Sequence, residues 1–460
     1  MEIKNKKVLL VGLGILGGGL SMAKYLLKEG AKLTITDLRT EEQLKKVMKK
    51  LPKNINYVLG KNRISDIKKA DIIILNPAVS NFSPLVKKIK ELKKEYYNDY
   101  AFFLKNLEKN NPKARIIGIT GTRGKTTVST WTKAFIDNAI LGGNIPEAAL
   151  FKIQNKKTDV FILELSSFQL EHLSQKDRSP NIAILTNIYI DHLNRYKTYD
   201  RYSRMKKLIY ANQTKNDYLI LNNDEKTTKE IEKDKPKSQI YYISQKKLPK
   251  NKSGIYTIDN DAYFKIDGLI KRIGSISSFA PHEKTNFMFA ALGAHLYGIS
   301  WGEIFKKVKG LENPLFRQQI IFNNKGLKII NDSAGTNPDA TIAAIEKYKN
   351  ENLYLITGGT DKELDSKELA KKIAKEINPK KLFLLSGSAT NNLVNNLPAN
   401  YLKTGDVRGF GSLEEIIKTV SKEIKNGVIV FSPGAASFEK FKNEFDRGNQ
   451  FNKFIKKYFE

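Results

Sequence analysis

The 460-residue chain contains no cysteine. This absence excludes disulfide bonds, thiolate-held metal ions and a cysteine nucleophile. Histidine is also scarce, with four residues in the whole chain. Any metal ion must therefore be held by oxygen ligands or by one of these few imidazoles.

Long hydrophobic runs are missing as well. No apolar stretch approaches the ~20 residues that a membrane-spanning helix requires. The N-terminus passes from a short basic segment directly into an apolar strand expected at residues 7–11, without a signal-peptide cleavage pattern. We therefore expect a cytoplasmic protein that does not insert into a membrane.

Acidic residues are few beside the basic ones. The chain has 79 Lys and Arg against 48 Asp and Glu, which gives a formal net charge of +31 at pH 7. A strongly basic protein can bind nucleic acid through counterion release. Here the lysines are spread over the chain, as in Lys45–Lys46, Lys246–Lys247 and Lys371–Lys372, and do not form one basic arm. We expect a solvated basic surface that attracts anionic nucleotides, and no nucleic-acid partner.

Short apolar segments alternate with lysine-rich amphipathic segments almost from end to end, and no internal repeat is visible. This alternation predicts an α/β protein with buried, mostly parallel sheets flanked by helices. The length exceeds what one hydrophobic core normally supports and predicts about three domains. The expected strands are residues 7–11, 32–36, 71–75, 115–120, 159–165, 181–186, 217–221, 327–331, 352–357, 382–386 and 427–432.

A variant phosphate-binding loop follows the strand expected at residues 115–120. Residues 118–127 read Gly-Ile-Thr-Gly-Thr-Arg-Gly-Lys-Thr-Thr, with the first glycine one residue further from the Gly-Lys pair than in the strict P-loop. Glycines let backbone N–H groups converge on a phosphate, Lys125 supplies a positive charge, and Thr126 supplies a hydroxyl suited to Mg²⁺. A Gly-Lys-Thr turn can also arise by chance. We predict ATP binding by Gly121, Thr122, Arg123, Gly124, Lys125, Thr126 and Thr127.

A second glycine-rich turn follows the first expected strand. Gly12, Gly14 and Gly17 have the spacing of a mononucleotide-binding fingerprint, and Asp37 ends the next expected strand. Taken alone, this pattern is typical of NAD binding, or of glycines that only allow a helix and a strand to pack closely. Few dehydrogenases carry a second phosphate loop a hundred residues later, so the pair of loops favours another function.

Two further segments carry polar residues at the ends of apolar strands. Glu164 ends the strand expected at residues 159–165, where the carboxyl ends of parallel strands meet and a Mg²⁺ ligand is needed. His192 lies in the segment 186–196, which follows the next strand. A single histidine in a loop is more often an ordinary polar residue, but the strand context and the adjacent Asp191 favour a place at the same site.

These motifs together resemble the Mur ligase family of peptidoglycan synthesis. The resemblance is carried by Gly-Thr-x-Gly-Lys-Thr-Thr, by Glu-Leu-Ser-Ser-Phe-Gln-Leu-Glu at 164–171 and by Asn-x-x-x-Asp-His-x-x-Arg-Tyr at 187–196. It continues through Gly142–Ile145, Asn331–Ser333, Thr336–Thr341, Gly358–Lys362 and Ser432–Asn443, so it covers the whole chain. Within the family, the chain is most similar to the enzymes that add D-glutamate to UDP-N-acetylmuramoyl-L-alanine.

The resemblance implies a monomeric ligase that activates a carboxylate with ATP as an acyl phosphate, which an amine then attacks. It implies three domains, a Rossmann-like domain at residues 1–105 for the UDP-sugar, a P-loop domain at 106–313 for ATP, and a Rossmann-like domain at 314–460 for the amino acid. The first boundary matches the polar segment 105–113, and the second the expected helix end near Leu311.

The family also implies roles for individual residues. Lys125 would hold the β- and γ-phosphates, Thr126 and Glu164 would bind one Mg²⁺, and His192 would bind a second. Lys206 matches a family lysine that CO₂ carbamylates, which turns a repelling ammonium into an anionic Mg²⁺ ligand. Its neighbour Lys207 is the alternative, and the Tyr-x-x-x-Lys-x-x-Ile-Tyr spacing favours Lys206.

The remaining contacts are implied in the same way. Further ATP contacts are expected from Asn286, Arg317 and Asp332. The uridine diphosphate would lie against Gly14, Ile15, Leu16, Gly17, Asp37 and Arg39, and the muramoyl part against Asn144, Ser166 and Gln169. The amino acid would contact Thr336, Lys362, Ser437 and Phe438. The chain departs from the family pattern at Glu283, Ala334 and Glu444–Phe445, and the last two departures leave the amino acid and its chirality open.

Two other classes of function compete with this interpretation. The chain could be a related amide ligase, such as another muramoyl ligase or a folylpolyglutamate synthetase, although Ser166–Gln169 and Gly358–Lys362 disfavour both. It could also be a non-catalytic protein that binds nucleotides or nucleic acid. The presence of Lys125, Glu164 and His192 argues against a silent scaffold.

Overall fold

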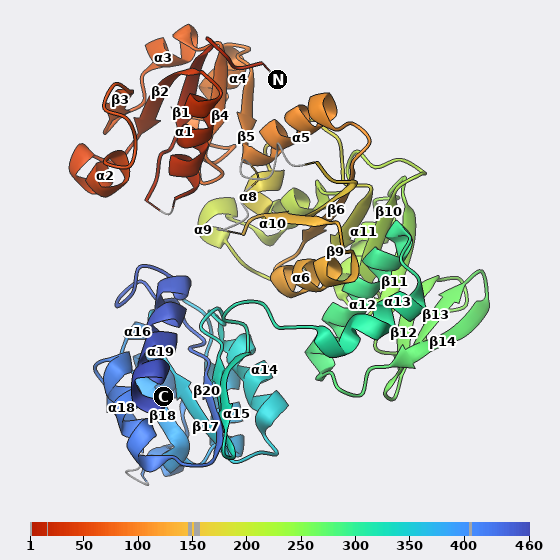
Figure 1. Cartoon of the computed structure of the whole chain (residues 1–460), viewed down its shortest axis with the longest axis vertical. Coiled ribbons are helices and arrows are strands. Elements are labelled where there is room, and N and C mark those ends of the chain that lie inside the picture. Colours follow the sequence, from red (N-terminus) through yellow and green to blue (C-terminus); the bar gives the residue numbers. More distant parts are fainter. Residues whose placement is uncertain (1, 16, 146–149, 151–156, 404–406) are drawn as a thin grey trace. The chain divides into compact units, whose positions relative to one another are not determined.

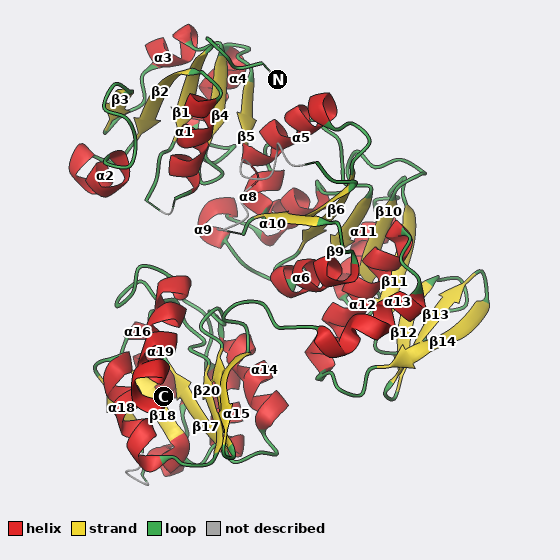
Figure 2. Cartoon of the chain, in the orientation of Figure 1, coloured by secondary structure: helices red, strands yellow, loops and turns green. Residues whose placement is uncertain are grey.

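The computed structural model describes residues 2–15, 17–145, 150, 157–403 and 407–460. The chain divides into two compact units, Met1–Leu311 and Glu312–Glu460. The first unit contains two sheets and the second unit one, and each sheet has helices packed beside it (Figures 1 and 2). None of the helices in the described ranges combines the length and the apolar character needed to cross a membrane.

The first sheet has five parallel strands in the order β3-β2-β1-β4-β5. The order reverses between β1 and its neighbour β4, and ligands of open α/β sheets bind at such a switch point. Its strands are β1 (Lys7–Val11), β2 (Lys32–Asp37), β3 (Asn56–Leu59), β4 (Ile72–Leu75) and β5 (Tyr96–Asn98). Its helices are α1 (Gly18–Lys28), α2 (Glu41–Met48), α3 (Ile64–Lys69) and α4 (Pro84–Glu91).

The second sheet has nine strands in the order β14-β13-β12-β11-β10-β9-β6-β8-β7. The strands are β6 (Arg115–Thr120), β7 (Ile140–Gly143), β8 (Val160–Glu164), β9 (Ile182–Leu185), β10 (Tyr218–Asn222), β11 (Gln239–Ser244), β12 (Gly254–Ile258), β13 (Asp261–Ile266) and β14 (Leu269–Ser275). The helices are α5 (Asp99–Asn110), α6 (Lys125–Phe135), α8 (Ser167–Leu170), α9 (Leu193–Tyr196), α10 (Tyr199–Lys207), α11 (Lys226–Lys233), α12 (Pro281–Tyr297) and α13 (Trp301–Lys307), followed by a 3₁₀ turn at Val308–Gly310.

Two hydrophobic cores hold this second sheet. One contains Trp131 of α6 and Phe287 of α12, and the other contains Phe103 of α5 and Tyr202 of α10. Each of these side chains is at least 98% buried, and burial of one large apolar side chain contributes about 1.5–3 kcal/mol. The two cores fix helices α6 and α10, which carry the candidate site residues.

The third sheet, in the second unit, has the order β15-β16-β20-β17-β18-β19 and is parallel except for the edge strand β15. The strands are β15 (Gln319–Asn324), β16 (Leu327–Asn331), β17 (Leu353–Thr357), β18 (Leu382–Leu385), β19 (Arg408–Phe410) and β20 (Gly427–Phe431). The helices are α14 (Pro338–Tyr348), α15 (Lys367–Glu376), α16 (Ser388–Asn396), α17 (Ala399–Leu402), α18 (Leu413–Glu423) and α19 (Glu444–Phe459), with a 3₁₀ turn at Pro379–Lys381.

The predicted three-part α/β architecture is confirmed, and every strand expected from the sequence is present within one residue at either end. The sequence pattern missed the antiparallel extension β12-β13-β14 and the antiparallel strand β15. It also missed the parallel strand β11 and the short strands β3, β5, β7 and β19.

Candidate active site

The phosphate loop joins strand β6 to helix α6. Gly124 caps the helix with a φ of 82°, and Gly121 has a φ of 151°. An ideal Cβ at Gly121 would lie 1.9 Å from the Thr186 hydroxyl, and one at Gly124 would lie 2.7 Å from Asn286 Oδ1. Both positions therefore require glycine, which leaves the backbone and the N-terminus of α6 open to the close approach of a phosphate.

The side chains of the loop are held by local contacts. Lys125 Nζ donates to the Thr122 carbonyl over 3.1 Å, so the amine lies against the loop. The Thr122 hydroxyl lies 3.1 Å from the Tyr202 hydroxyl of α10. Arg123 lies over the Tyr189 ring, 5.1 Å from its centroid. Thr126 and Thr127 follow in the first turn of α6, so the predicted ATP residues 121–127 span the loop and the start of this helix.

Glu164 ends strand β8, which pairs with β6 on one side and β7 on the other. The residue is 4% exposed, and its Oε2 atom is buried without a hydrogen-bond partner among the described residues. A buried carboxylate oxygen without a donor is costly, and a bound cation would satisfy it.

Lys206 is buried on helix α10 and reaches the phosphate loop. Its Nζ atom donates to the Gly121 carbonyl over 2.8 Å and lies 4.8 Å from the centroid of the Tyr202 ring. Burial, and then the charge of Lys125, hold the pKa of Lys206 well below its ordinary value, while Glu164 acts in the opposite direction. The structure therefore places Lys206 at the Gly121 carbonyl, within reach of the charges of Lys125 and Glu164.

His192 precedes the short helix α9 in a left-handed conformation, with a φ of 52°. Its ring lies 4.9 Å from the Phe168 ring and 5.9 Å from the Tyr202 ring, and its Nε2 atom lies 3.8 Å from Asp191 Oδ2. The Tyr202 contact places the imidazole on the side of α10 that faces the phosphate loop. The side chain is 44% exposed, which leaves it accessible to a ligand.

The donor set fits Mg²⁺. A carboxylate oxygen of Glu164 and the hydroxyl of Thr126 are the hard ligands that this ion prefers. In the described part of the chain, no three His, Asp or Glu side chains are grouped so that they could hold a metal ion by themselves. Phosphate oxygens and water would therefore supply the other ligands, as is usual at sites where Mg²⁺ binds with a nucleotide.

The glycine turn of the first sheet is closed by Asp37. Its Oδ2 atom accepts the Gly14 N–H over 2.9 Å, and its Oδ1 atom accepts the Arg39 N–H over 2.9 Å. Gly17 caps α1 with a φ of 97°, and Ile15 is 57% exposed beside it. Leu16, predicted at the same turn, lies outside the described residues. The Asp37 side chain is 2% exposed, so its observed role is to hold the turn through these backbone hydrogen bonds.

Ser166 and Gln169 form the capping box of helix α8. The Gln169 side-chain oxygen accepts from the Ser166 N–H and hydroxyl, both over 3.1 Å, and its Nε2 atom donates to Asp99 Oδ2 over 2.8 Å. Asn144 is exposed, and its N–H donates to the Glu164 carbonyl over 2.7 Å. Sequence reasoning missed Asp99, because an acidic residue at the start of a helix is common for other reasons.

In the second unit, Asp332 is buried, and each of its carboxylate oxygens accepts a hydrogen bond. Its Oδ2 atom accepts from the Ser432 hydroxyl over 2.6 Å, and its Oδ1 atom accepts the Gln318 N–H over 3.0 Å. Burial raises the pKa of Asp332 to about 6. Arg317 lies next in sequence to Gln318, and its N–H donates to the Pro314 carbonyl.

The predicted amino-acid residues lie around two adjoining surfaces of the second unit. Lys362 Nζ donates to the Thr336 hydroxyl over 3.1 Å, and both residues line a pocket that also includes Gly434. Ser437 lines a neighbouring pocket, and its buried hydroxyl has no hydrogen-bond partner among the described residues. Phe438 is 65% exposed.

The departures from the family pattern have local structural roles. The Glu283 carboxylate accepts the Ala280 N–H over 2.9 Å and so caps helix α12. Ala334 is buried. The ring of Phe445 lies 6.2 Å from the ring of Phe316 in an edge-to-face contact.

A buried arginine that the sequence did not reveal lines the same pocket as Ser437. Arg447 of α19 is fully buried and donates to the carbonyls of Ser333, Ala435 and Ala436, over 2.8, 3.1 and 2.9 Å. Burial lowers the pKa of Arg447 to about 10. In a lysine-rich sequence, a charged residue near the C-terminus has no signal that separates it from a surface cation.

Comparison with known proteins identifies the family. Three family models match consecutive parts of the chain: the Mur ligase MurD-like N-terminal domain over residues 6–96, the Mur ligase middle domain over 119–294, and the Mur ligase glutamate ligase domain over 316–436. Proteins named UDP-N-acetylmuramoylalanine--D-glutamate ligase are similar over nearly the full length. The protein of Borreliella afzelii is 35% identical over 99% of this chain and 98% of its own length. That of Thermoanaerobacter sp. is 32% identical over 99% of both chains, and that of Clostridioides difficile is 33% identical over 98% of both.

Solved structures show the same fold. The UDP-N-acetylmuramate-alanine ligase MurC of Thermotoga maritima has a TM-score of 0.59 at 16% identity, covering 98% of this chain and 100% of that one. MurF of the same organism, solved in complex with ADP, has a TM-score of 0.57 at 16% identity, covering 99% and 96%. The full-length matches in sequence, in family models and in fold together make this chain a member of the Mur ligase family.

Proposed function

We propose that the protein is a cytoplasmic, ATP-dependent, ADP-forming ligase that joins D-glutamate to UDP-N-acetylmuramoyl-L-alanine during synthesis of peptidoglycan precursors. The main support is a glycine loop shaped for phosphate, with Lys125 and Lys206 bound to two of its successive carbonyls and the charge of Glu164 acting on Lys206. The relatives that match nearly the whole chain carry the name of this activity.

The proposed reaction has two steps, transfer of the γ-phosphoryl group to the substrate carboxylate and formation of the amide bond. An oxygen of the alanine carboxylate forms a bond to the γ-phosphorus of ATP while the bond from that phosphorus to the β–γ bridging oxygen breaks and ADP leaves. The glutamate amine then forms a C–N bond to the acyl carbon, the C–O bond to phosphate breaks, and the amine loses its proton to solvent. No covalent bond to the protein forms, which agrees with the absence of cysteine.

The residues act through charge and position. Lys125 neutralises charge on the transferred phosphoryl group, and the N-terminus of α6 stabilises the phosphates with its N–H groups. Glu164 and Thr126 would hold one Mg²⁺ and His192 a second, and these ions would offset the repulsion between the triphosphate and the substrate carboxylate. Asn286, whose amide oxygen lies against Gly124, is proposed to contact the adenine side of ATP.

Lys206 is proposed to react with CO₂. An unprotonated amine is the form that attacks CO₂, and the depressed pKa of Lys206 favours that form. The new N–C bond and the loss of one proton give an anionic carbamate, which would be an oxygen ligand for Mg²⁺ next to Glu164. Activity in CO₂-depleted buffer should fall and should return when bicarbonate is added.

The substrate sites are proposed on the three sheets. The glycine turn of residues 12–17, with Asp37 and Arg39, is proposed for uridine diphosphate, and Asn144, Ser166 and Gln169 for the muramoyl part. The second unit is proposed for the amino acid, through Thr336, Lys362, Ser437 and Phe438, with Arg317 and Asp332 contributing to ATP binding. The corresponding domains are residues 1–105, 106–313 and 314–460.

Phosphate release tests the proposal. Purified protein with ATP, Mg²⁺ and UDP-N-acetylmuramoyl-L-alanine should release phosphate with D-glutamate, and the Lys125→Ala variant should not. L-glutamate, diamino acids and dipeptides should be offered in the same assay, because Ala334 and Glu444–Phe445 depart from the family pattern. Preference for a diamino acid would identify a different Mur-type ligase, and no release with any amine would overturn the proposal.

A further inference from the structure

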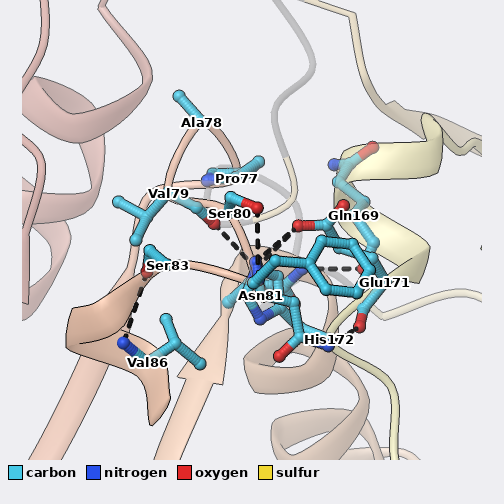
Figure 3. A network of polar contacts seen from close by, with 12 residues as sticks. Pro77, Ala78, Val79, Ser80, Asn81, Ser83, Val86, Gln169, Glu171 and His172 are labelled. Atoms are coloured by element: carbon cyan, nitrogen blue, oxygen red, sulfur yellow. Dashed lines mark hydrogen bonds and ion pairs between the residues drawn. The ribbon is translucent and has the colours of Figure 1, made fainter. Parts of the chain in front are cut away.

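Within the first unit, a buried polar network joins the loop after strand β4 to the segment that carries α8 and α9. Figure 3 shows Val79 and Asn81 of this loop beside Glu171 and His172, which follow α8. The loop lies at the carboxyl end of β4, next to the glycine turn at the switch point of the first sheet.

Arg195 of α9 binds the backbone of this loop. Its Nη1 atom donates to the Ala78 carbonyl over 2.8 Å, and its Nη2 atom donates to the carbonyls of Pro77 and Val79 over 3.0 and 3.3 Å. The guanidinium also lies over the Phe168 ring, 4.1 Å from its centroid. Three successive carbonyls on one cation need the fixed fork of donors that arginine has and lysine lacks.

Glu171 supplies the carboxylate that accepts hydrogen bonds from Arg195 and from the loop. Its side chain is fully buried, and its Oε2 atom accepts from Arg195 Nε over 3.2 Å and from the Tyr196 hydroxyl over 2.8 Å. Its Oε1 atom accepts from Arg195 Nη2 and from the Asn81 N–H, the latter over 2.8 Å. A buried ion pair is stable only when its remaining hydrogen-bonding positions are satisfied, and here the loop supplies the missing partners.

The other end of the loop is fixed to the glycine turn. Asn76 Nδ2 donates to the Gly12 carbonyl over 3.1 Å, and Asn76 Oδ1 accepts the Ala78 N–H over 3.0 Å. An ideal Cβ at Gly12 would lie 2.9 Å from Asn76 Cβ, so the two backbones approach closely. A continuous chain of hydrogen bonds therefore leads from the glycine turn through the loop to Arg195, three residues after His192.

We propose that Arg195 is a positioning residue that, together with Glu171, fixes the loop of residues 76–81 to helix α9. This inference rests on the proposed function, in which the glycine turn takes uridine diphosphate and His192 acts beside the phosphate loop. The contacts of Arg195 and Glu171 then set the distance between the glycine turn, which holds the uridine diphosphate end of the substrate, and the phosphate loop, where the carboxylate of the substrate is activated. Misplacement of reacting groups by about 1 Å can cost on the order of 10²-fold in rate.

Kinetics of Arg195→Ala and Arg195→Lys test the role. We expect the KM for UDP-N-acetylmuramoyl-L-alanine to rise and kcat to fall, each at least about tenfold, which corresponds to ~1.4 kcal/mol for each factor. The KM for ATP should change by less than about twofold, because the hydrogen bonds of Arg195 go to the loop of residues 76–81 and to Glu171. Added guanidinium ion should restore part of the activity of Arg195→Ala, since the vacated space is lined by three carbonyls and a carboxylate, and should not restore Arg195→Lys.

Arg178→Ala is the matched control. Arg178 also donates to backbone carbonyls, those of Pro112 and Ala114, but it does not contact the loop of residues 76–81. Loss of an arginine that caps carbonyls should therefore cost stability in both variants, and should raise the KM for the UDP-sugar only in Arg195→Ala. Equal changes in both variants, or an equal rise in the KM for ATP, would overturn the positioning role.

Hydrogen exchange separates this inference from the proposed function. In Arg195→Ala, the amides of residues 78–82 should exchange at least about tenfold faster, while those of strand β1 stay unchanged. This readout needs no substrate, so it stands even if the wild-type protein releases no phosphate. Unchanged exchange in residues 78–82 would show that Arg195 does not hold the loop, whatever the activity of the wild type.

Discussion

Asp99, a half-buried carboxylate, allows a worked prediction for Asp99→Asn. Asp99 begins helix α5, where its Oδ2 atom accepts from Gln169 Nε2 and its Oδ1 atom accepts the Tyr100 N–H over 2.9 Å. Burial, offset in part by these hydrogen bonds, raises the pKa of Asp99 to about 6, against 3.8 for an ordinary aspartate. Between about pH 4 and pH 6, Asp99 is therefore protonated in the folded protein and ionised in the unfolded chain.

The sign and size follow from this difference. A folded-state pKa above the unfolded one means that the stability of the wild type falls as pH rises from about 4 to 6, by up to ~3 kcal/mol at 1.36 kcal/mol per pKa unit. Asparagine removes this charge but loses one acceptor, which costs ~1 kcal/mol at every pH. Asp99→Asn should therefore be destabilised by ~1 kcal/mol at pH 4 and stabilised by up to ~2 kcal/mol at pH 7.

Urea denaturation followed by tryptophan fluorescence measures this effect. Both tryptophans of the chain, Trp131 and Trp301, lie in the core of the second sheet, against which α5 also packs. Asp71→Asn is the control, since the Asp71 carboxylate also accepts a backbone N–H, that of Lys7, but is exposed to solvent. The reasoning is refuted if the stability difference between Asp99→Asn and the wild type is the same at pH 4 and pH 7.

Three further predictions concern the site and the second unit. Glu164→Gln should raise the Mg²⁺ concentration for half-maximal phosphate release at least about tenfold, since an amide is a poorer ligand than a carboxylate; an unchanged Mg²⁺ titration would count against a metal ligand here. Gly124→Ala should raise the KM for ATP about tenfold or more, because its Cβ would meet Asn286 Oδ1 at 2.7 Å and the φ of 82° strains an L-residue; wild-type ATP kinetics would contradict this. Arg447→Met should lower the free energy of unfolding of residues 312–460 by ~3–5 kcal/mol, seen as faster proteolysis of that unit, because carbonyls such as that of Ser333 lose their donor; unchanged proteolysis would show that they find other partners.

The strands that sequence reasoning recovered are those buried on both faces. Strands β6, β8 and β9 are rich in Ile, Val and Leu, and such apolar segments stand out in a lysine-rich chain. Strand β14 is largely exposed and strand β5 has three residues, so neither has a hydrophobic pattern to detect. Their pairing is decided by neighbours elsewhere in the chain and not by their own composition.

The same contrast holds for the site. The phosphate loop was predictable because its glycines, Lys125 and Thr126 are contiguous in sequence. The contact between Lys206 and the Gly121 carbonyl spans 85 residues, and only the family resemblance pointed to it. Arg195 belongs to the motif at 187–196, but its role could not be predicted, because that role depends on which carbonyls the fold brings to it.

Helix α19 has a consequence for how the second unit matures in the cell. Its Phe451 stacks on Phe431 of the central strand β20. Its Arg447 donates to the carbonyls of Ala435 and Ala436, which line the pockets. Because α19 follows all strands of the third sheet in chain order, the ribosome synthesises those strands before it. The nascent second unit therefore has an uncovered sheet face until α19 has emerged, and it completes its core and its pockets only then.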